Sequence, residues 1–131
     1  MNSVFLLSGK TLCVRRLKED DLKYSYYEVM NLLSQADRTI LQSRDMIYIL
    51  DNEHIYFVVE DISIRMIVGV CSLVINNDIS DLCKIGVIEN IMLRDDYKNI
   101  GLYDIIFKKV QDYCLSVKHC LKIIVKCSSE I

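Results

Sequence analysis

The sequence of 131 residues lacks the features that mark several large classes of protein. It has no run of about 18 consecutive apolar residues, which argues against a membrane-spanning helix. Its 16 Lys and Arg are balanced by 18 Asp and Glu, so the basic footprint of a nucleic-acid-binding domain is missing. The apolar start, Val4 to Leu7, is too short for the core of a secretion signal and has no basic flank. We therefore expect a cytoplasmic protein that binds neither nucleic acid nor a membrane.

Residues that bind metals are also scarce or badly spaced. The two histidines, His54 and His119, lie far apart in sequence, and no two cysteines have the Cys-x-x-Cys spacing. The six cysteines are irregularly spaced and mostly have apolar neighbours. Such cysteines are typical of small buried hydrophobic residues in a reducing compartment rather than of a disulfide framework. The sequence therefore predicts no metal site and no disulfide scaffold.

What the sequence does have is enough apolar material for one packed core. Hydrophobic residues make up 52% of the chain, and neither repeats nor a low-complexity linker divides it, so we expect one domain spanning residues 1–131. Alternating or β-branched runs predict strands at Leu12–Leu17, Ile55–Val59, Met66–Ile75, Cys83–Leu93 and Leu121–Val125. Helical spacing predicts helices over about 21–33, with Leu22, Tyr26, Val29, Met30 and Leu33 on one face, over about 39–50, and from Leu102 onward.

The order of these elements predicts an α/β (α+β) fold. The middle strands are joined by short turns, as in an antiparallel meander. The strand that ends at Leu93 is followed by a polar loop, a helix and another strand, which predicts a parallel pair joined by a right-handed crossover. We expect a mixed, mostly antiparallel central sheet flanked by helices.

The segment from Gly86 to Lys109 is the one most informative about function. In it a strand ends in a polar loop, and the loop opens a helix whose first turn offers unpaired N–H groups and a positive dipole end. A phosphate or pyrophosphate fits such a site, Gly101 would let the backbone approach it closely, and Lys98 could add a charge. An ordinary turn with a glycine is the alternative explanation of the same pattern.

The segment Tyr97 to Leu102 resembles the acetyl-CoA loop of GNAT acyltransferases. Lys98 stands for the family's basic or amide residue and Gly101 for its first glycine, whereas Asn99 and Tyr103 replace small residues. The preceding Gly86-Val87-Ile88-Glu89-Asn90 resembles the Gly-x-(Ile/Val)-Glu-Asp motif of the glucosamine 6-phosphate N-acetyltransferases. Further similarities to that family run in order through the chain, at Leu12–Leu17, Asp21-Leu22, Leu33-Ser34, Val58–Asp61 and Leu121–Ser128.

The resemblance implies an enzyme that moves the acetyl group of acetyl-CoA to the amine of glucosamine 6-phosphate, on the route to UDP-N-acetylglucosamine. A backbone N–H near Ile91 or Met92 would polarise the thioester carbonyl. The implied donor-binding residues are Ile91, Met92, Leu93, Lys98, Asn99, Ile100, Gly101, Leu102 and Tyr103. No metal is implied.

For the acceptor, the resemblance implies that Glu89 and Asn90 orient the amine and bind sugar hydroxyls. Ser34 matches a family threonine near the sugar, and Lys84 would meet the sugar phosphate. Each has a structural alternative: Glu89 as a buried carboxylate that needs a partner, Asn90 as the end of a sheet ladder, and Lys84 as a solvated strand residue.

The sequence also departs from the family. Asn90 replaces an aspartate, which removes a negative charge from the sugar site. Family members continue past the last predicted strand with a Phe-Tyr-x-Lys segment and a final strand that builds a homodimer, whereas this sequence ends at Ile131. From this we expect an exposed edge on the strand Leu121–Val125. Two alternatives therefore stay open: a catalytically impaired binding protein of the same fold, and a GNAT enzyme for another amine.

Overall fold

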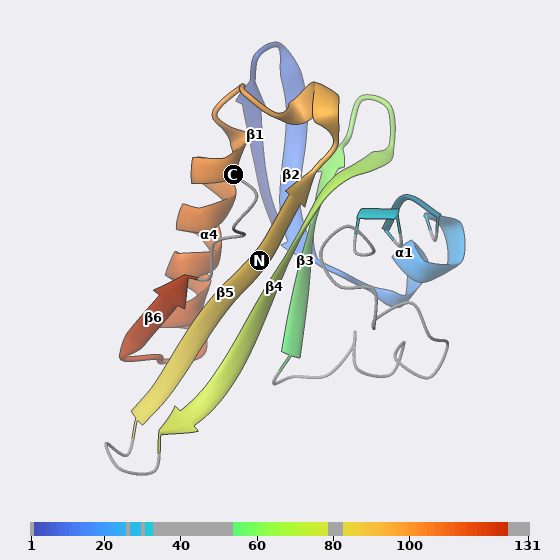
Figure 1. The fold of residues 1–131 in the computed structure, drawn as a ribbon. Helices are drawn as coiled ribbons and strands as arrows, with labels where there is room; N and C mark the ends of the chain where they lie inside the picture. The colour runs from blue at the N-terminus through green and yellow to red at the C-terminus, as the bar shows by residue number, and fades with distance from the viewer. Residues whose placement is uncertain (1, 26, 30, 33–53, 79–82, 126–131) are drawn as a thin grey trace.

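The computed structural model describes residues 2–25, 27–29, 31–32, 54–78 and 83–125, which form one sheet with helices on both faces (Figure 1). The six strands lie side by side in chain order, β1 to β6. The elements are β1 Asn2–Leu7, β2 Lys10–Arg16, α1 Glu19–Tyr24, β3 His54–Asp61, β4 Met66–Asp78, β5 Cys83–Leu93, the 3-10 helix η3 Asp95–Tyr97, α4 Leu102–Ser116 and β6 Lys122–Val125.

The predicted mixed sheet is confirmed. Neighbouring strands from β1 to β5 are antiparallel, and β6 is parallel to β5. The connection between the parallel strands contains α4, as a crossover requires. Because β5 begins at Cys83 and ends at Leu93, its predicted bounds were also correct.

The strand period of two divides the core between the faces of the sheet. In β3, Ile55, Phe57 and Val59 pack in the cluster that contains α4 residues. Tyr56 and Val58 pack in a second cluster with Val29 and Leu32, which follow α1. A strand buried on both faces has no polar alternation, which explains why its sequence is a continuous apolar run.

The run Leu12–Leu17 is a strand as predicted, β2, but it is the second strand of the chain, because the unpredicted β1 precedes it. β1 pairs antiparallel with β2 through the turn Ser8-Gly9, where both residues have positive φ, as in a two-residue hairpin. Val4 and Leu6 are exposed while Phe5 and Leu7 pack against the core. β1 is thus an edge strand that buries one face only.

The start of α1 is fixed to the sheet by a buried ion pair. Both guanidinium NH groups of Arg15 donate to Asp21 at 2.7 Å, and Glu60 accepts from the same guanidinium at 3.2 Å. The Asp21 carboxylate also accepts the N–H of Lys18 at 2.9 Å, so it caps the start of the helix. The hydrogen bond to Asp21 raises the pKa of Arg15 despite burial.

Other predicted helical features have different outcomes. α1 ends at Tyr24; of the predicted apolar face, Val29 is buried and Leu22 is partly buried, and Leu32, which was not predicted to lie on that face, is buried as well. Tyr26, Met30, Leu33 and the helix predicted over 39–50 lie outside the described residues. The predicted helix from Leu102 is α4, and of its expected apolar stripe Leu102, Ile106, Val110 and Tyr113 are buried while Ile105 is half-buried. None of the described helices is long and apolar enough to cross a membrane.

Candidate functional site

The candidate site begins where the regular pairing of β5 with β4 is interrupted. Val70 pairs with Met92, but Ser72 pairs with Glu89, so two steps along β4 correspond to three steps along β5. The extra residue forms a bulge at Asn90-Ile91, and the Ser72 hydroxyl holds its near end by donating to the Glu89 carbonyl at 3.0 Å. A bulge turns backbone N–H groups out of the ladder, which makes them available to a ligand.

On the other side of β5, the pairing with β6 ends just before the bulge. β6 pairs with Ile85 to Ile88 through Lys122 to Val125. In the described part of the chain no strand pairs with Glu89 to Leu93 on this side. Among the described strands β6 pairs with β5 alone. The bulged half of β5 therefore offers main-chain groups toward the space beside β6.

Beyond β5 the chain forms the loop that opens α4. The one-turn η3 is followed by Lys98, and then Asn99 and Gly101 adopt φ values of 63° and 83°. No side chain of the described residues caps the first turn of α4, where Gly101 is the N-cap. A Cβ on Gly101 would meet no described atom within 4 Å. The helix thus presents free N–H groups and its positive end to an open space.

No protein-family model matches the chain. Its fold is similar to glucosamine-6-phosphate N-acetyltransferase from Arabidopsis thaliana, with a TM-score of 0.69 and 23% identity over 92% of this chain and 85% of that chain. It is also similar to an acetyltransferase from Trypanosoma brucei, with a TM-score of 0.70 and 26% identity over 91% and 84% of the two chains. An aminoglycoside acetyltransferase from an uncultured soil metagenomic sample gives a TM-score of 0.72 at 16% identity, over 90% and 78%.

The chain has the GNAT fold. The fold class expected from the sequence is therefore confirmed, whereas the substrate is not decided by likeness at these identities. The bulged β5, the loop and the start of α4 are the segments that carry the residues predicted to bind the donor. The individual site residues remain predictions, and the structure gives their positions.

The predicted donor residues form one continuous path. Ile91 and Met92 lie at the bulge, with their side chains packed against the α4-side and α1-side cores respectively. Leu102 is buried beneath the helix start, whereas Tyr103 is 41% exposed. Lys98 is exposed and forms an ion pair with Asp95 at 2.9 Å. Of these three side chains only that of Leu102 is buried, whereas those of Lys98 and Tyr103 are exposed beside the start of α4.

The predicted acceptor residues are less well gathered. Glu89 is half-buried at the bulge, and the side chain of Asn90 and all of Ser34 lie outside the description. Lys84 is exposed near the opposite end of β5, five residues before Glu89, which is roughly 17 Å along a strand. The structure therefore brings Glu89 to the donor path and leaves Lys84 away from it.

Cys71, which lies on β4 opposite the bulge, is a conceivable nucleophile. It is buried, and burial together with the nearby charge of Glu89 raises the pKa of its thiol well above the ordinary value. The thiol therefore stays protonated near neutral pH and is a poor nucleophile. This electrostatic arrangement favours direct attack of an amine over a cysteine-bound intermediate.

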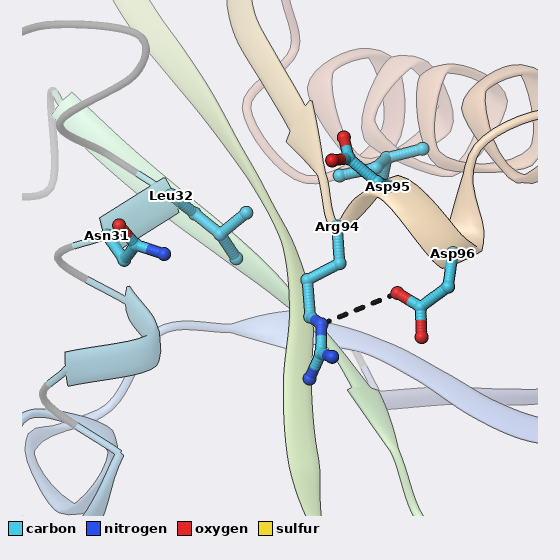
Figure 2. A pocket seen from close by; sticks show the side chains of 6 residues that line it. Asn31, Leu32, Arg94, Asp95 and Asp96 are labelled. Carbon is cyan, nitrogen blue, oxygen red and sulfur yellow. Dashed lines mark ion pairs between the residues drawn. The ribbon is translucent and has the colours of Figure 1, made fainter.

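A pocket of about 310 Å³ lies beside the end of β5, between Asn31-Leu32 and the segment Leu93–Asp96 (Figure 2). Arg94 forms an ion pair with Asp96 at 3.5 Å within it, and Asp95 adds a second exposed carboxylate. The sequence analysis did not predict this pocket; the only hint was the polar composition that begins directly after β5. Among the described residues, no group of three His, Cys, Asp or Glu is placed to hold a metal ion.

Proposed function

We propose that this chain transfers an acetyl group from acetyl-CoA to a primary amine. The observation that carries the proposal is the continuity of the bulge at Asn90-Ile91 with the open helix start at Gly101. A backbone N–H of Ile91 or Met92 would stabilise the negative charge on the thioester oxygen. The N–H groups of Asn99 to Tyr103 would bind the pyrophosphate at the positive end of α4.

In this reaction the amine nitrogen attacks the thioester carbonyl carbon directly. The carbon–nitrogen bond forms, the carbon–sulfur bond breaks, and the thiolate of CoA leaves. The amine loses a proton to water or a main-chain carbonyl, and the thiolate takes one up. Glu89 at the bulge would orient the amine rather than form a bond to it.

For the acceptor we propose glucosamine 6-phosphate, on the route to UDP-N-acetylglucosamine. Support comes from the Gly86–Asn90 motif and from the likeness in fold to the Arabidopsis enzyme of that name. Glu89, Asn90 and Ser34 are the proposed sugar contacts, and Lys84 stays a prediction for the phosphate. A cytoplasmic site of action and a homodimer are further expectations of the same proposal.

A second candidate is another, more cationic amine. The pocket beside β5 is lined by the carboxylates of Asp95 and Asp96, which a positively charged acceptor could bind by replacing their present partners Lys98 and Arg94. Likeness in fold to an aminoglycoside acetyltransferase fits this candidate equally well.

The deciding experiment is a thiol-release assay with acetyl-CoA and a set of amines, alongside calorimetry with CoA. Glucosamine 6-phosphate, glucosamine and an aminoglycoside are compared, with N-acetylglucosamine 6-phosphate as the control whose amine is blocked. Thiol release with glucosamine 6-phosphate above the other amines supports the first candidate, and release with the aminoglycoside alone supports the second. If CoA binds but no amine causes release of its thiol, the chain is a non-catalytic binding protein. If CoA does not bind at millimolar concentration, the proposal is overturned.

A further inference from the structure

Tyr97, the residue directly before the predicted donor loop, is held from across the sheet. Its hydroxyl donates a 2.5 Å hydrogen bond to Oδ2 of Asp61, the last residue of β3. Both residues are only 2% exposed, and 36 positions separate them in sequence. A short bond to a buried carboxylate is among the stronger hydrogen bonds in proteins.

Asp61 is itself held in one orientation. Its other oxygen, Oδ1, accepts the hydroxyl of Ser63 at 2.6 Å and the Ser63 N–H at 3.2 Å. Although burial acts to raise the pKa of Asp61, the hydrogen bonds from Ser63 and Tyr97 lower it overall. The ammonium of Lys10 lies 4.5 Å from the centre of the Tyr97 ring. The acceptor is therefore an ionised, fully engaged group that cannot follow Tyr97 if the loop moves.

The loop depends on this attachment because it is fixed firmly only at its two ends. Tyr97 is buried at one end and Leu102 at the other. Between them Lys98 and Asn99 are exposed and Gly101 faces open space, and Ile100 alone packs partly against the core. A shift of Tyr97, the fully buried residue at the start of the loop, would therefore displace the N–H groups of Asn99 to Gly101 against this one partial contact.

We propose that the Tyr97–Asp61 hydrogen bond is a positioning contact for the acyl donor, which holds the loop Lys98–Gly101 in the conformation that binds the pyrophosphate of CoA. This inference rests on the proposed function, since it assumes that CoA binds at the loop. Tyr97 does not touch the ligand in this scheme; it acts by keeping the main-chain donors preorganised.

The test is Tyr97→Phe in the full chain, which removes one oxygen atom and keeps the ring. Calorimetry with CoA should give a Kd about tenfold higher than that of the wild type, the size expected when a hydrogen bond to a charged group is lost. Without ligand, hydrogen exchange of the amides at 98–101 should become faster. The matched control is Tyr113→Phe, because Tyr113 is a buried tyrosine of α4 that packs edge-on against Phe57. It should change neither the Kd nor the exchange of the loop.

The outcomes separate the two claims. If the wild type binds CoA and Tyr97→Phe binds equally well, the positioning role is wrong and the donor site stands. If both tyrosine variants lose affinity to the same extent, the effect is one of general stability and the positioning role is again wrong. If the wild type itself does not bind millimolar CoA, the proposed function fails first and this inference fails with it.

Discussion

Gly86 of β5 lies directly against the thiol of Cys114 in α4. A methyl group on Gly86 would lie 2.1 Å from Sγ of Cys114 and 3.5 Å from Sγ of Cys120. Burial and a hydrogen bond with Cys120 raise the pKa of Cys114 to about 12, so this thiol is a neutral packing group. The first residue of the Gly86–Asn90 motif is therefore explained by the close approach of α4 to the central strand.

Gly86→Ala should destabilise the protein by about 1–3 kcal/mol, because the added methyl overpacks the contact between β5 and α4. Cys114→Ala removes the thiol that the methyl would meet. In the double variant the penalty of Gly86→Ala should largely disappear, which urea unfolding of all four proteins would show. If the changes in the free energy of unfolding of the two single variants simply add in the double variant, the side chain of Cys114 does not contact residue 86.

Gly101→Asp should raise the Kd for CoA about tenfold or more, whereas Gly101→Asn should raise it less. Both side chains have room, and asparagine and aspartate tolerate the left-handed conformation similarly, so the pair differs in charge. Lys98→Ala should cost only about two- to threefold, because its charge is exposed and shared with Asp95. Calorimetry with CoA measures the Kd of each variant. Equal losses of affinity in Gly101→Asp and Gly101→Asn would mean that the pyrophosphate does not bind beside Gly101.

Asp104→Asn should tighten CoA binding by about two- to fivefold. Asp104 lies in the first turn of α4, where its carboxylate opposes an incoming anion. Asp112→Asn, two turns further along the same helix, is the control and should leave the Kd unchanged. The gain should shrink at high ionic strength. A weaker rather than tighter complex would show that Asp104 organises the helix start instead of repelling the ligand.

Glu89→Gln should lower kcat/KM for glucosamine 6-phosphate by about tenfold or more and leave the Kd for CoA nearly intact. The substitution keeps the shape of the side chain and removes the charge that would orient the amine, so the loss falls on the transition state. Thiol release gives the rate and calorimetry gives the donor affinity. A parallel loss of both would assign Glu89 to the donor side or to stability.

The Tyr97 hydroxyl should also make the wild type sensitive to alkaline pH. Burial and the bond to Asp61 raise the pKa of Tyr97 to about 12 from an ordinary 10.0. Because the folded-state pKa is the higher one, this stabilisation is complete below pH 10 and is lost as pH rises from about 10 to 12. Urea unfolding across that range should show a steeper fall for wild type than for Tyr97→Phe. Parallel pH profiles would contradict the assignment.

Local patterns in the sequence were sufficient for most of the central sheet. The runs that became β3, β4 and β5 are apolar and β-branched enough to form strands in many contexts, and the strand–loop–helix–strand order predicted the parallel pair. β1 was missed because its apolar run, Val4 to Leu7, is short and buries only one face, so its pairing with β2 is what makes it a strand.

The loop before α4, where we propose that the donor binds, could likewise be placed from the sequence, because a glycine between a strand and an amphipathic helix is a local feature. The contacts that shape the site could not. The bulge at Asn90-Ile91 exists only in the register between β4 and β5, Tyr97 meets Asp61 across 36 residues, and Gly86 meets Cys114 through the packing of a helix on a sheet. The sequence by itself determined the elements, since propensity and periodicity act over a few residues. Only the tertiary structure decided which distant side chains fix the loop, since long-range packing selects those partners.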